Sequence, residues 1–282
     1  MKKYNYLFTG ASTRGFCYVG VLKALEEREI YPDICAGSSI GAIILTFYIL
    51  GYTVDEIEKE IDKLNMIKLF SDFNLNFVGD FALVNGNKYY NWLKEKIETK
   101  FYGEKYQKVK GKPVCFKDIE QELIIAAVNV ETSDYEIFSN ETTPDMELAL
   151  ALRITSSMPG LLKSVIYKGK TFIDGDILRA KPIWKAADKL IEEPKKLLEF
   201  RITGGKKNKV SRNPVKYVNA IVNTAAYNID NEAANTYKNY INIVQIDINN
   251  LLFTDFILPK ERKKQIYKTG YEVTIEYLKN II

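Results

Sequence analysis

Short apolar runs alternate with longer segments of helical periodicity along this 282-residue chain. The short runs predict β-strands at 4–8, 34–36, 122–130, 135–139, 171–173, 198–202 and 243–248. The longer segments predict helices at 16–29, 40–50, 53–64, 89–101, 146–154, 214 to about 240, and 259–278. Residues 65–86, rich in Phe, Asn and Gly, match neither pattern, and we predict irregular structure there. Strands that alternate with helices indicate an α/β fold with a mainly parallel sheet. No repeat, linker or shift in composition divides the chain, so we expect one domain over residues 1–282.

No segment of the sequence is suited to crossing a membrane. The longest strongly apolar run, 42–50, is well below the ~20 residues that a transmembrane helix needs. The N-terminal apolar run breaks at Thr9 and Gly10, too early for a secretory signal. We therefore expect a protein of the cytoplasm or of a host-cell cytosol, peripheral to membranes at most.

Cysteine usage and charge agree with this expectation. The cysteines are Cys17, Cys35 and Cys115. They are odd in number and form no C-x-x-C pair, which is typical of buried thiols in a reducing compartment. The net charge of +4 is mild and lacks the concentrated basic footprint of nucleic-acid-binding proteins, so we expect no nucleic-acid partner.

The chain contains no histidine. This excludes Ser-His-Asp triads, Cys-His dyads, H-E-x-x-H zinc sites and every histidine general base. Acid–base chemistry must therefore use carboxylates, lysine, tyrosine or cysteine. Without histidine or a C-x-x-C pair a transition-metal site is not expected, and we predict neither a metal nor another cofactor.

Residues 8–15 read F-T-G-A-S-T-R-G and follow the first predicted strand, so their backbone N–H groups are suited to holding an anion. A P-loop is excluded, because Phe and Cys follow Gly15 where Lys and then Ser or Thr are required. A dinucleotide turn of the short-chain dehydrogenase kind lacks its third glycine at Cys17. The Tyr106 and Lys110 pair has the spacing used by those enzymes, but it lies in a charged stretch with weak helical character. That interpretation stays the weaker alternative. The third candidate for the anion held by this turn is the oxyanion of a reacting ester.

The second motif is Gly37-Ser38-Ser39-Ile40-Gly41, between a predicted strand and a predicted apolar helix. This is the context of a nucleophile elbow, in which flanking glycines allow a sharp turn that exposes the central serine. The helix beginning there would point backbone N–H groups at an anion formed beside Ser39. The plain alternative is a glycine-rich turn that only packs a strand against a helix.

A serine nucleophile needs a base, and the third motif supplies a carboxylate. Phe172-Ile173-Asp174-Gly175-Asp176 places Asp174 at the end of a short predicted strand, where it could reach the sheet edge that carries Ser39. Asp176 is the weaker candidate, since its side chain should point away from the direction of Asp174. By itself the motif is also compatible with an ordinary Asp-Gly turn.

Together these motifs resemble the patatin-like phospholipases, serine-aspartate acyl hydrolases related to cytosolic phospholipase A2. The turn from Gly10 to Gly15, the Gly37–Gly41 elbow and the Asp174-Gly175-Asp176 motif with Pro182 match in order. The segment 153–161, R-I-T-S-S-M-P-G-L, resembles the A-S-x-x-x-P segment of that family. The likeness covers about residues 4–190, and residues 253–270 fit the usual C-terminal ending of the family.

The resemblance implies a single three-layer α/β domain with helices on both faces of the sheet. It implies that Ser39 is the nucleophile, Asp174 its base, and Gly37 and Gly41 the glycines of the elbow. The oxyanion hole implied by the resemblance comprises Gly10, Ala11, Ser12, Thr13, Arg14, Gly15 and the N–H of Ile40. The expected substrate is a phospholipid, a lysophospholipid or another lipid ester, cleaved through an acyl-enzyme. Arg14 would either contact a substrate phosphate or fix the loop.

Two departures from the family pattern limit this expectation. The opening turn is Gly10-Ala11-Ser12 instead of G-G-G, which would be strained if position 11 or 12 needs a positive φ. Asp176 replaces a small residue, and its carboxylate would either raise the pKa of Asp174 or simply face solvent. The alternative function is therefore a catalytically weak or inactive lipid-binding or regulatory protein on the same fold.

Two further segments bear on the substrate. The apolar side chains between 66 and 84 would line an acyl channel, touch a membrane or pack on the core. They are Met66, Leu69, Phe70, Phe73, Leu75, Phe77 and Phe81. A basic loop would either meet anionic head groups or be simply solvated. Its residues are Lys206, Lys207, Lys209 and Arg212.

Overall fold

The computed structural model describes residues 2–178, 183–204, 241–251 and 255–281, and the single residues 217, 236 and 239. The predicted helix from 214 to about 240 and the basic loop of Lys206, Lys207, Lys209 and Arg212 lie outside these residues, apart from the three single positions. Pro182 of the third motif lies outside them as well.

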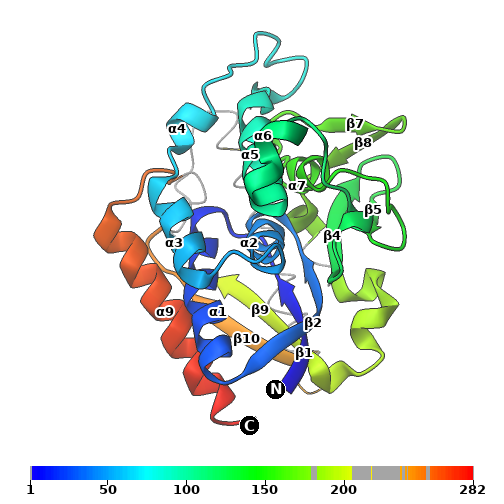
Figure 1. Cartoon of the computed structure of the whole chain (residues 1–282). Helices are drawn as coiled ribbons and strands as arrows, with labels where there is room; N and C mark the ends of the chain where they lie inside the picture. The colour runs from blue at the N-terminus through cyan, green and yellow to red at the C-terminus, as the bar shows by residue number, and fades with distance from the viewer. Residues whose placement is uncertain are drawn as a thin grey trace.

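The centre of the molecule is a mixed, mainly parallel sheet with strand order β10-β9-β1-β2-β4-β8-β7, in which β5 also pairs with β4 (Figure 1). The parallel strands are β1 (Lys2–Phe8), β2 (Ile30–Gly37), β4 (Glu122–Asn129), β9 (Leu197–Thr203) and β10 (Asn242–Asp247). The antiparallel strands are β5 (Asp134–Ser139), β7 (Val165–Tyr167) and β8 (Lys170–Ile173). The α/β fold with a mainly parallel sheet is therefore confirmed.

The helices lie around this sheet and in the segments that join its strands. They are α1 (Tyr18–Glu27), α2 (Ser39–Ile49), α3 (Val54–Lys63), α4 (Met66–Leu69), α5 (Asn87–Tyr102), α6 (Tyr106–Val109), α7 (Leu148–Thr155) and α9 (Lys260–Leu278). Thr53 caps α3 in the capping box that the sequence predicts: its side chain accepts from the N–H of Glu56, and Glu56 accepts from the N–H of Thr53.

Alternation along the strands separates two cores. Tyr6 and Phe8 of β1 belong to the large core that α1, α2, α7 and α9 cover. Leu7, between them, belongs to a smaller core on the other face, to which the short 3₁₀ helices Ile183–Ala186 and Asp188–Ile191 contribute side chains. Side chains one residue apart on a strand point to opposite faces, so a single apolar strand supplies both cores.

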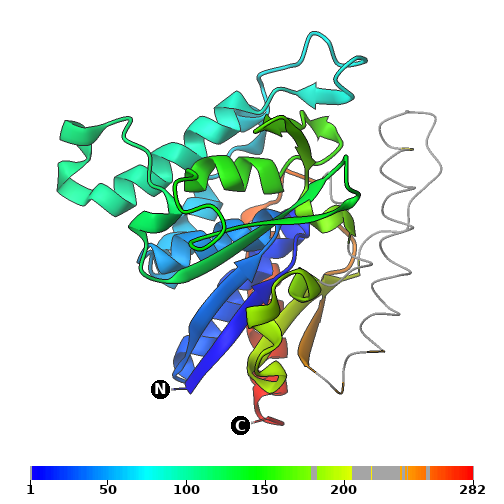
Figure 2. The same cartoon turned by 90° about the vertical axis from the view of Figure 1, so that its right-hand side faces the viewer.

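The prediction of irregular structure at 65–86 is wrong in part. That segment contains α4 and a short strand, β3 (Ala82–Val84), which pairs in parallel with β6 (Gly160–Leu162). Strands of three residues are too short for a periodic signal, and β6 and β7 were missed in the sequence for the same reason. The turn between α4 and α5 projects at the top of the molecule in both views (Figures 1 and 2).

Candidate active site

The backbone at Ser39 forms a sharp turn between a strand and a helix. β2 ends at Gly37 and α2 begins at Ser39, whose φ is +48°, a value that residues other than glycine rarely adopt. A Cβ atom on Gly37 would lie 2.8 Å from the N of Ala42, and one on Gly41 would lie 2.2 Å from the O of Phe8. Both glycines are therefore needed for the close packing of the turn, and the geometry at Ser39 is that of a strained elbow.

Thr155 fixes this elbow, and sequence reasoning gave it no role. Its Oγ1 accepts a hydrogen bond from the N–H of Ser39 at 3.0 Å and donates one to the O of Ala126 at 2.5 Å. Thr155 is the fully buried last residue of α7, so this hydroxyl ties the start of α2 to strand β4. The T-S-S stretch of the sequence contains three hydroxyls, and nothing in its spacing identifies the one that contacts the elbow.

Strand pairing brings Asp174 to the elbow. One edge of β4 is occupied by β5, which pairs with residues 124–129. β2 pairs with residues 122–125 of β4, and β8 pairs with residues 128 and 129. Because their pairings overlap with that of β5, β2 and β8 must both lie on the opposite edge of β4. β2 is parallel to β4 and β8 is antiparallel, so their carboxyl ends point toward each other along this edge. Gly175 completes the junction: a Cβ there would lie 2.1 Å from the O of Ala126 and 3.1 Å from the Cβ of Ser38.

The carboxyl group of Asp174 is buried and held in place. The side chain is 1% exposed, its backbone N–H donates to the O of Ser157 at 3.0 Å, and its Oδ1 accepts from the N–H of Asp176 at 2.8 Å. Ser39 and Asp174 line the same cavity. The two residues that sequence reasoning paired are thus brought to one site, although they are 135 positions apart in the chain.

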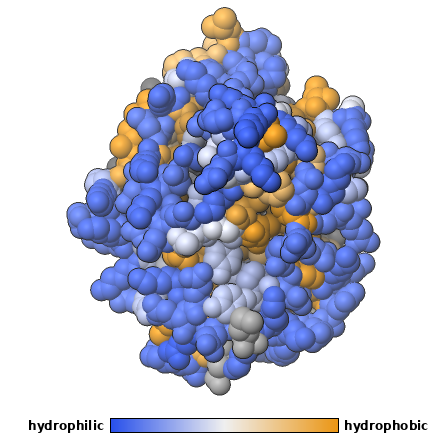
Figure 3. Space-filling model, in the orientation of Figure 1, coloured by the Kyte–Doolittle hydropathy of each residue, from blue (hydrophilic) through white to orange (hydrophobic). Residues whose placement is uncertain are grey.

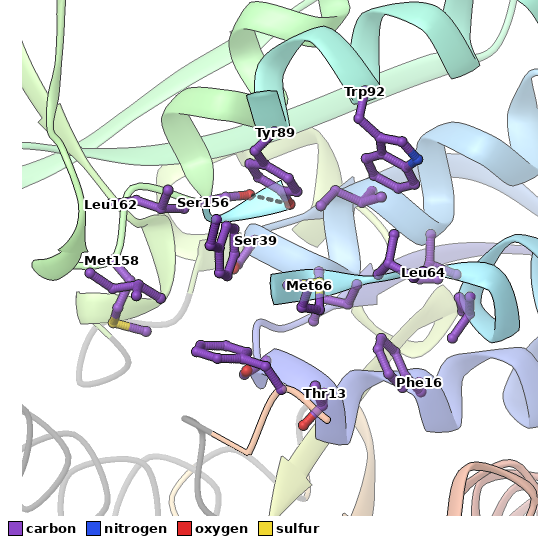
Figure 4. A pocket seen from close by; sticks show the side chains of 18 of the residues that line it. Thr13, Phe16, Ser39, Leu64, Met66, Tyr89, Trp92, Ser156, Met158 and Leu162 are labelled. Atoms are coloured by element: carbon purple, nitrogen blue, oxygen red, sulfur yellow. Dashed lines mark hydrogen bonds between the residues drawn. The ribbon is translucent and has the colours of Figure 1, made fainter. Parts of the chain in front are cut away.

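The cavity is mostly apolar, and besides Ser39 and Asp174 its polar lining residues include Ser12, Thr13, Glu60 and Ser156. Figure 4 shows Ser39 among Met66, Tyr89, Ser156 and Met158. Burial raises the pKa of Tyr89 to about 12, and the nearby charge of Asp174 contributes in the same direction. The Tyr89 hydroxyl therefore stays protonated at neutral pH, and it donates weakly to the Ser156 hydroxyl at 3.5 Å.

The opening turn lies against the elbow. Its residues Ser12 and Thr13 line the cavity together with Ile40. Gly15 packs on Ile40, where a Cβ would lie 2.3 Å from Cγ2. Ala11 has an extended φ of −163°, whereas Ser12 has a φ of +53°. Position 12 is thus the one that requires a left-handed backbone, and a serine occupies it.

Asp176 does not simply face solvent. Its Oδ1 accepts a hydrogen bond from the N–H of Gly10 at 3.0 Å. A Cβ on Gly10 would lie 2.9 Å from the Cβ atoms of both Ser39 and Asp176, which shows how closely the three residues approach. In this structure the N–H of Gly10 is therefore engaged by a carboxylate that the sequence could not place.

Arg14 is buried and fixes the loop. Its Nη1 donates to the O of Gly204 at 2.6 Å and its Nε to the O of Ala11 at 3.4 Å. The side chain is not among the residues that line the cavity. These contacts favour the interpretation of Arg14 as a structural residue over contact with a substrate phosphate.

A second buried arginine, Arg153, joins three segments of the chain. Its guanidinium donates to the Oγ of Ser157 at 2.7 Å and to the O of Asn85 and the O of Lys163, both at 2.8 Å. Burial lowers its pKa to about 10, so it remains charged at neutral pH. Arg153 thereby joins α7 to the segment before β7 and to the residues after β3. The sequence predicts none of these contacts.

A wider groove adjoins the cavity. Both are lined by Met66, Phe70, Leu161 and Phe256, so they meet at these residues. The cavity around Ser39 has a volume of about 90 Å³ and the groove about 790 Å³. Ligand sites of about 300–1,000 Å³ are typical for drug-sized molecules, so of these two spaces the groove is the one with a volume in that range.

The seven apolar residues named between 66 and 84 divide into two groups. Met66, Leu69 and Phe70 are half-buried, and Met66 and Phe70 line the cavity. Phe73, Leu75, Phe77 and Phe81 are instead exposed, so packing on the core is wrong for these four. None of the helices described is long and apolar enough to cross a membrane.

The chain is similar to known proteins in sequence and in fold. A family model described as patatin-like phospholipase matches residues 7–187. The chain is 30% identical over 177 residues to protein R571 of Acanthamoeba polyphaga mimivirus, covering 61% of this chain and 57% of that protein. It is also 30% identical over 192 residues to "Probable lipid hydrolase 463L" of Invertebrate iridescent virus 6, covering 64% of this chain and 63% of that protein. The chain therefore spans less than two thirds of both relatives.

Among solved structures, VipD from Legionella pneumophila is similar in fold. The TM-score is 0.72 at 16% sequence identity, covering 98% of this chain and 67% of that protein. At this identity the likeness concerns the fold alone.

Proposed function

Because the chain belongs to the patatin-like phospholipase family, we propose that it is a lipid acyl hydrolase in which Ser39 and Asp174 form a catalytic dyad. The substrate is a fatty-acyl ester of a phospholipid or lysophospholipid, and the enzyme is a serine esterase of the phospholipase A type. We propose further that residues 1–282 form a single patatin-like domain.

The chemistry uses Asp174 as the only base. The Oγ of Ser39 attacks the ester carbonyl carbon while its proton passes to the Asp174 carboxylate. The tetrahedral intermediate collapses, the bond to the alcohol oxygen breaks, and Asp174 returns the proton to that oxygen. Water then attacks the acyl-enzyme, Asp174 accepts its proton, and the fatty acid leaves as Ser39 recovers a proton.

Backbone N–H groups would stabilise the developing oxyanion. Ile40 is the second residue of α2, so its N–H has no acceptor within the helix and lies at the positive end of the helix dipole. The backbone of Ser12 and Thr13, which line the cavity, approaches from the opening turn. One well-placed donor of this kind contributes about 3–4 kcal/mol to lowering the barrier.

The observation that carries the proposal is the meeting of the carboxyl ends of β2 and β8 on one edge of β4, which delivers a strained Ser39 and a buried Asp174 to one apolar cavity. The test is labelling with a fluorophosphonate, which traps an activated serine. Ser39 should be labelled, and Ser38, Ser156 and Ser157 should not. Labelling that persists in a folded Ser39→Ala variant would refute the assignment.

One observation favours a second candidate, a lipid-binding or regulatory protein with weak or no hydrolysis. The N–H of Gly10, one of the donors predicted for the oxyanion hole, is engaged by Asp176. If that bond persists when a lipid is bound, the hole has one donor fewer. The same labelling experiment separates the two candidates, because a non-catalytic protein would bind lipid and leave Ser39 unlabelled.

A further inference from the structure

Among the described residues, exposed apolar side chains are concentrated on α4 and on the loop that follows it. Thirteen large hydrophobic side chains are exposed among the described residues, and seven of them lie between positions 67 and 83. They are Ile67, Phe73, Leu75, Phe77, Val78, Phe81 and Leu83. Figure 3 shows hydrophobic side chains at the top of the molecule, where Figure 1 places the turn between α4 and α5. We call residues 72–85 the apical loop. Patches of this kind mark interaction sites more often than scattered single residues do.

The apical loop buries one polar side chain, Asn74, while the apolar side chain next to it is exposed. Asn74 is 7% exposed: its Nδ2 donates to the O of Ala82 and to Oδ2 of Asp80, and its N–H donates to the O of Leu83. Leu75, the next residue, is 97% exposed. The loop thus holds Asn74 in its own frame and leaves large apolar side chains in solvent.

The backbone of the apical loop satisfies its hydrogen bonds internally at several points. The N–H of Asp80 donates to the O of Asn76, that of Ala82 to the O of Phe77, and that of Asn85 to the O of Asp72. Backbone groups that enter a lipid phase must find partners within the protein, because no water is available there. This loop therefore has an ordered frame that can carry apolar side chains into the edge of a bilayer.

Basic side chains lie at the base of the apical loop. Lys68 on α4 and Lys88 at the start of α5 are exposed, and neither forms an ion pair with a carboxylate among the described residues. Lys163 pairs with Asp80 at 2.8 Å, which neutralises the acid of the loop nearest its tip. An apolar tip above basic groups is complementary to a leaflet whose anionic head groups cover an apolar interior.

The same loop borders the groove that leads to Ser39. Phe73 and Leu83 of the apical loop line the groove, which meets the catalytic cavity at Met66 and Phe70. An acyl chain that leaves a bilayer at this loop would therefore find apolar contacts along its path to the cavity.

We propose that the apical loop docks the protein on anionic membranes by inserting its apolar tip among the lipids, with Lys68 and Lys88 at the head groups. The role of the loop in substrate delivery rests on the function proposed above, whereas the docking itself is measured without any hydrolysis. The occupant of the surface is thus a lipid bilayer.

The test compares how strongly the wild type and its variants bind vesicles, measured by cosedimentation of the protein. One set of vesicles is phosphatidylcholine alone, and the other is equal parts phosphatidylcholine and phosphatidylserine. The variant is Leu75→Ser with Phe77→Ser, since both side chains are exposed and neither lines the cavity or the groove. The matched control is Ile166→Ser, an exposed apolar residue on β7. Hydrolysis of a soluble short-chain p-nitrophenyl ester reports on the catalytic site.

We expect the double variant to bind mixed vesicles at least tenfold more weakly than the wild type, with hydrolysis of the soluble ester unchanged and the control like the wild type. Lys68→Gln with Lys88→Gln should remove the preference for phosphatidylserine. Vesicle binding equal to that of the wild type in the double variant would overturn the proposal. So would a wild type that ignores vesicles and forms a dimer that depends on the loop, because a second copy would then cover this surface. A wild type that binds vesicles but hydrolyses no ester would refute the proposed function and leave the docking proposal standing.

Discussion

Replacing Asp174 by asparagine tests the dyad directly. The amide has nearly the shape of the carboxylate, and its oxygen can still accept the hydrogen bond that the N–H of Asp176 donates to Oδ1 at 2.8 Å. The variant should therefore fold, with a loss of stability of about 1 kcal/mol from the weaker, uncharged hydrogen bond. What it cannot do is accept the proton of Ser39. In a triad the aspartate orients a histidine, and this chain has no histidine to orient.

The expected loss of activity follows from that role. A positioned general base contributes about 10²–10⁴-fold, and Asp174 is the only base in the proposed mechanism, so we expect kcat to fall by roughly 10³–10⁴-fold. Asp176→Asn is the matched control, because it lies two residues away and accepts from the N–H of Gly10 at 3.0 Å. In this control the bond is weakened by about 1 kcal/mol, so we expect kcat to change by no more than roughly fivefold, far less than in Asp174→Asn.

The assay is hydrolysis of a p-nitrophenyl acyl ester, after circular dichroism and thermal unfolding have shown that each variant is folded. The double variant Ser39→Ala with Asp174→Asn should be little worse than either single variant, because the two groups act as a unit. A folded Asp174→Asn protein that keeps most of its activity would refute the dyad. An Asp176→Asn variant that is the more damaged of the two would show that the base has been assigned to the wrong carboxylate.

Three further predictions concern the surroundings of the dyad. Ser12→Gly should stabilise the fold by about 0.5–1 kcal/mol, because φ is +53° at that position. Ala11→Gly should destabilise it by a similar amount, because φ at Ala11 is extended. Urea unfolding measures the change in the free energy of unfolding for each variant, and changes of the same sign would contradict the reasoning. Thr155→Val leaves the N–H of Ser39 without its acceptor and should lower the free energy of unfolding by about 1–3 kcal/mol, with a clear loss of kcat. Thr155→Ser keeps the hydroxyl and should resemble the wild type. A Val variant with normal kinetics would show that Thr155 does not position Ser39. Excess EDTA should leave hydrolysis of a soluble short-chain ester unchanged, and an activity that is lost with EDTA and restored by added metal would overturn the expectation that the chemistry needs no metal.

The candidate site was predictable because its motifs are local. A turn that exposes a serine needs small residues at fixed distances along the chain, and Gly37 and Gly41 show this in the sequence before any fold is known. The strand that precedes Asp174 is equally local. The absence of histidine depends on no structure, and it restricts the base to a few side-chain types.

Local sequence patterns therefore suffice to predict the alternation of strands and helices, the turn at Ser39 and a carboxylate at Asp174. The groups that surround these residues depend on long-range packing: Thr155 accepts from the N–H of Ser39, and Asp176 accepts from the N–H of Gly10. Both contacts join segments more than 100 residues apart, and the pairing of β2 and β8 on one edge of β4 creates the junction between those segments. The apical loop illustrates the same limit, because apolar residues look alike in a sequence whether they face the core or solvent. Hydrogen bonds within the loop turn Asn74 inward, and Leu75 therefore points outward.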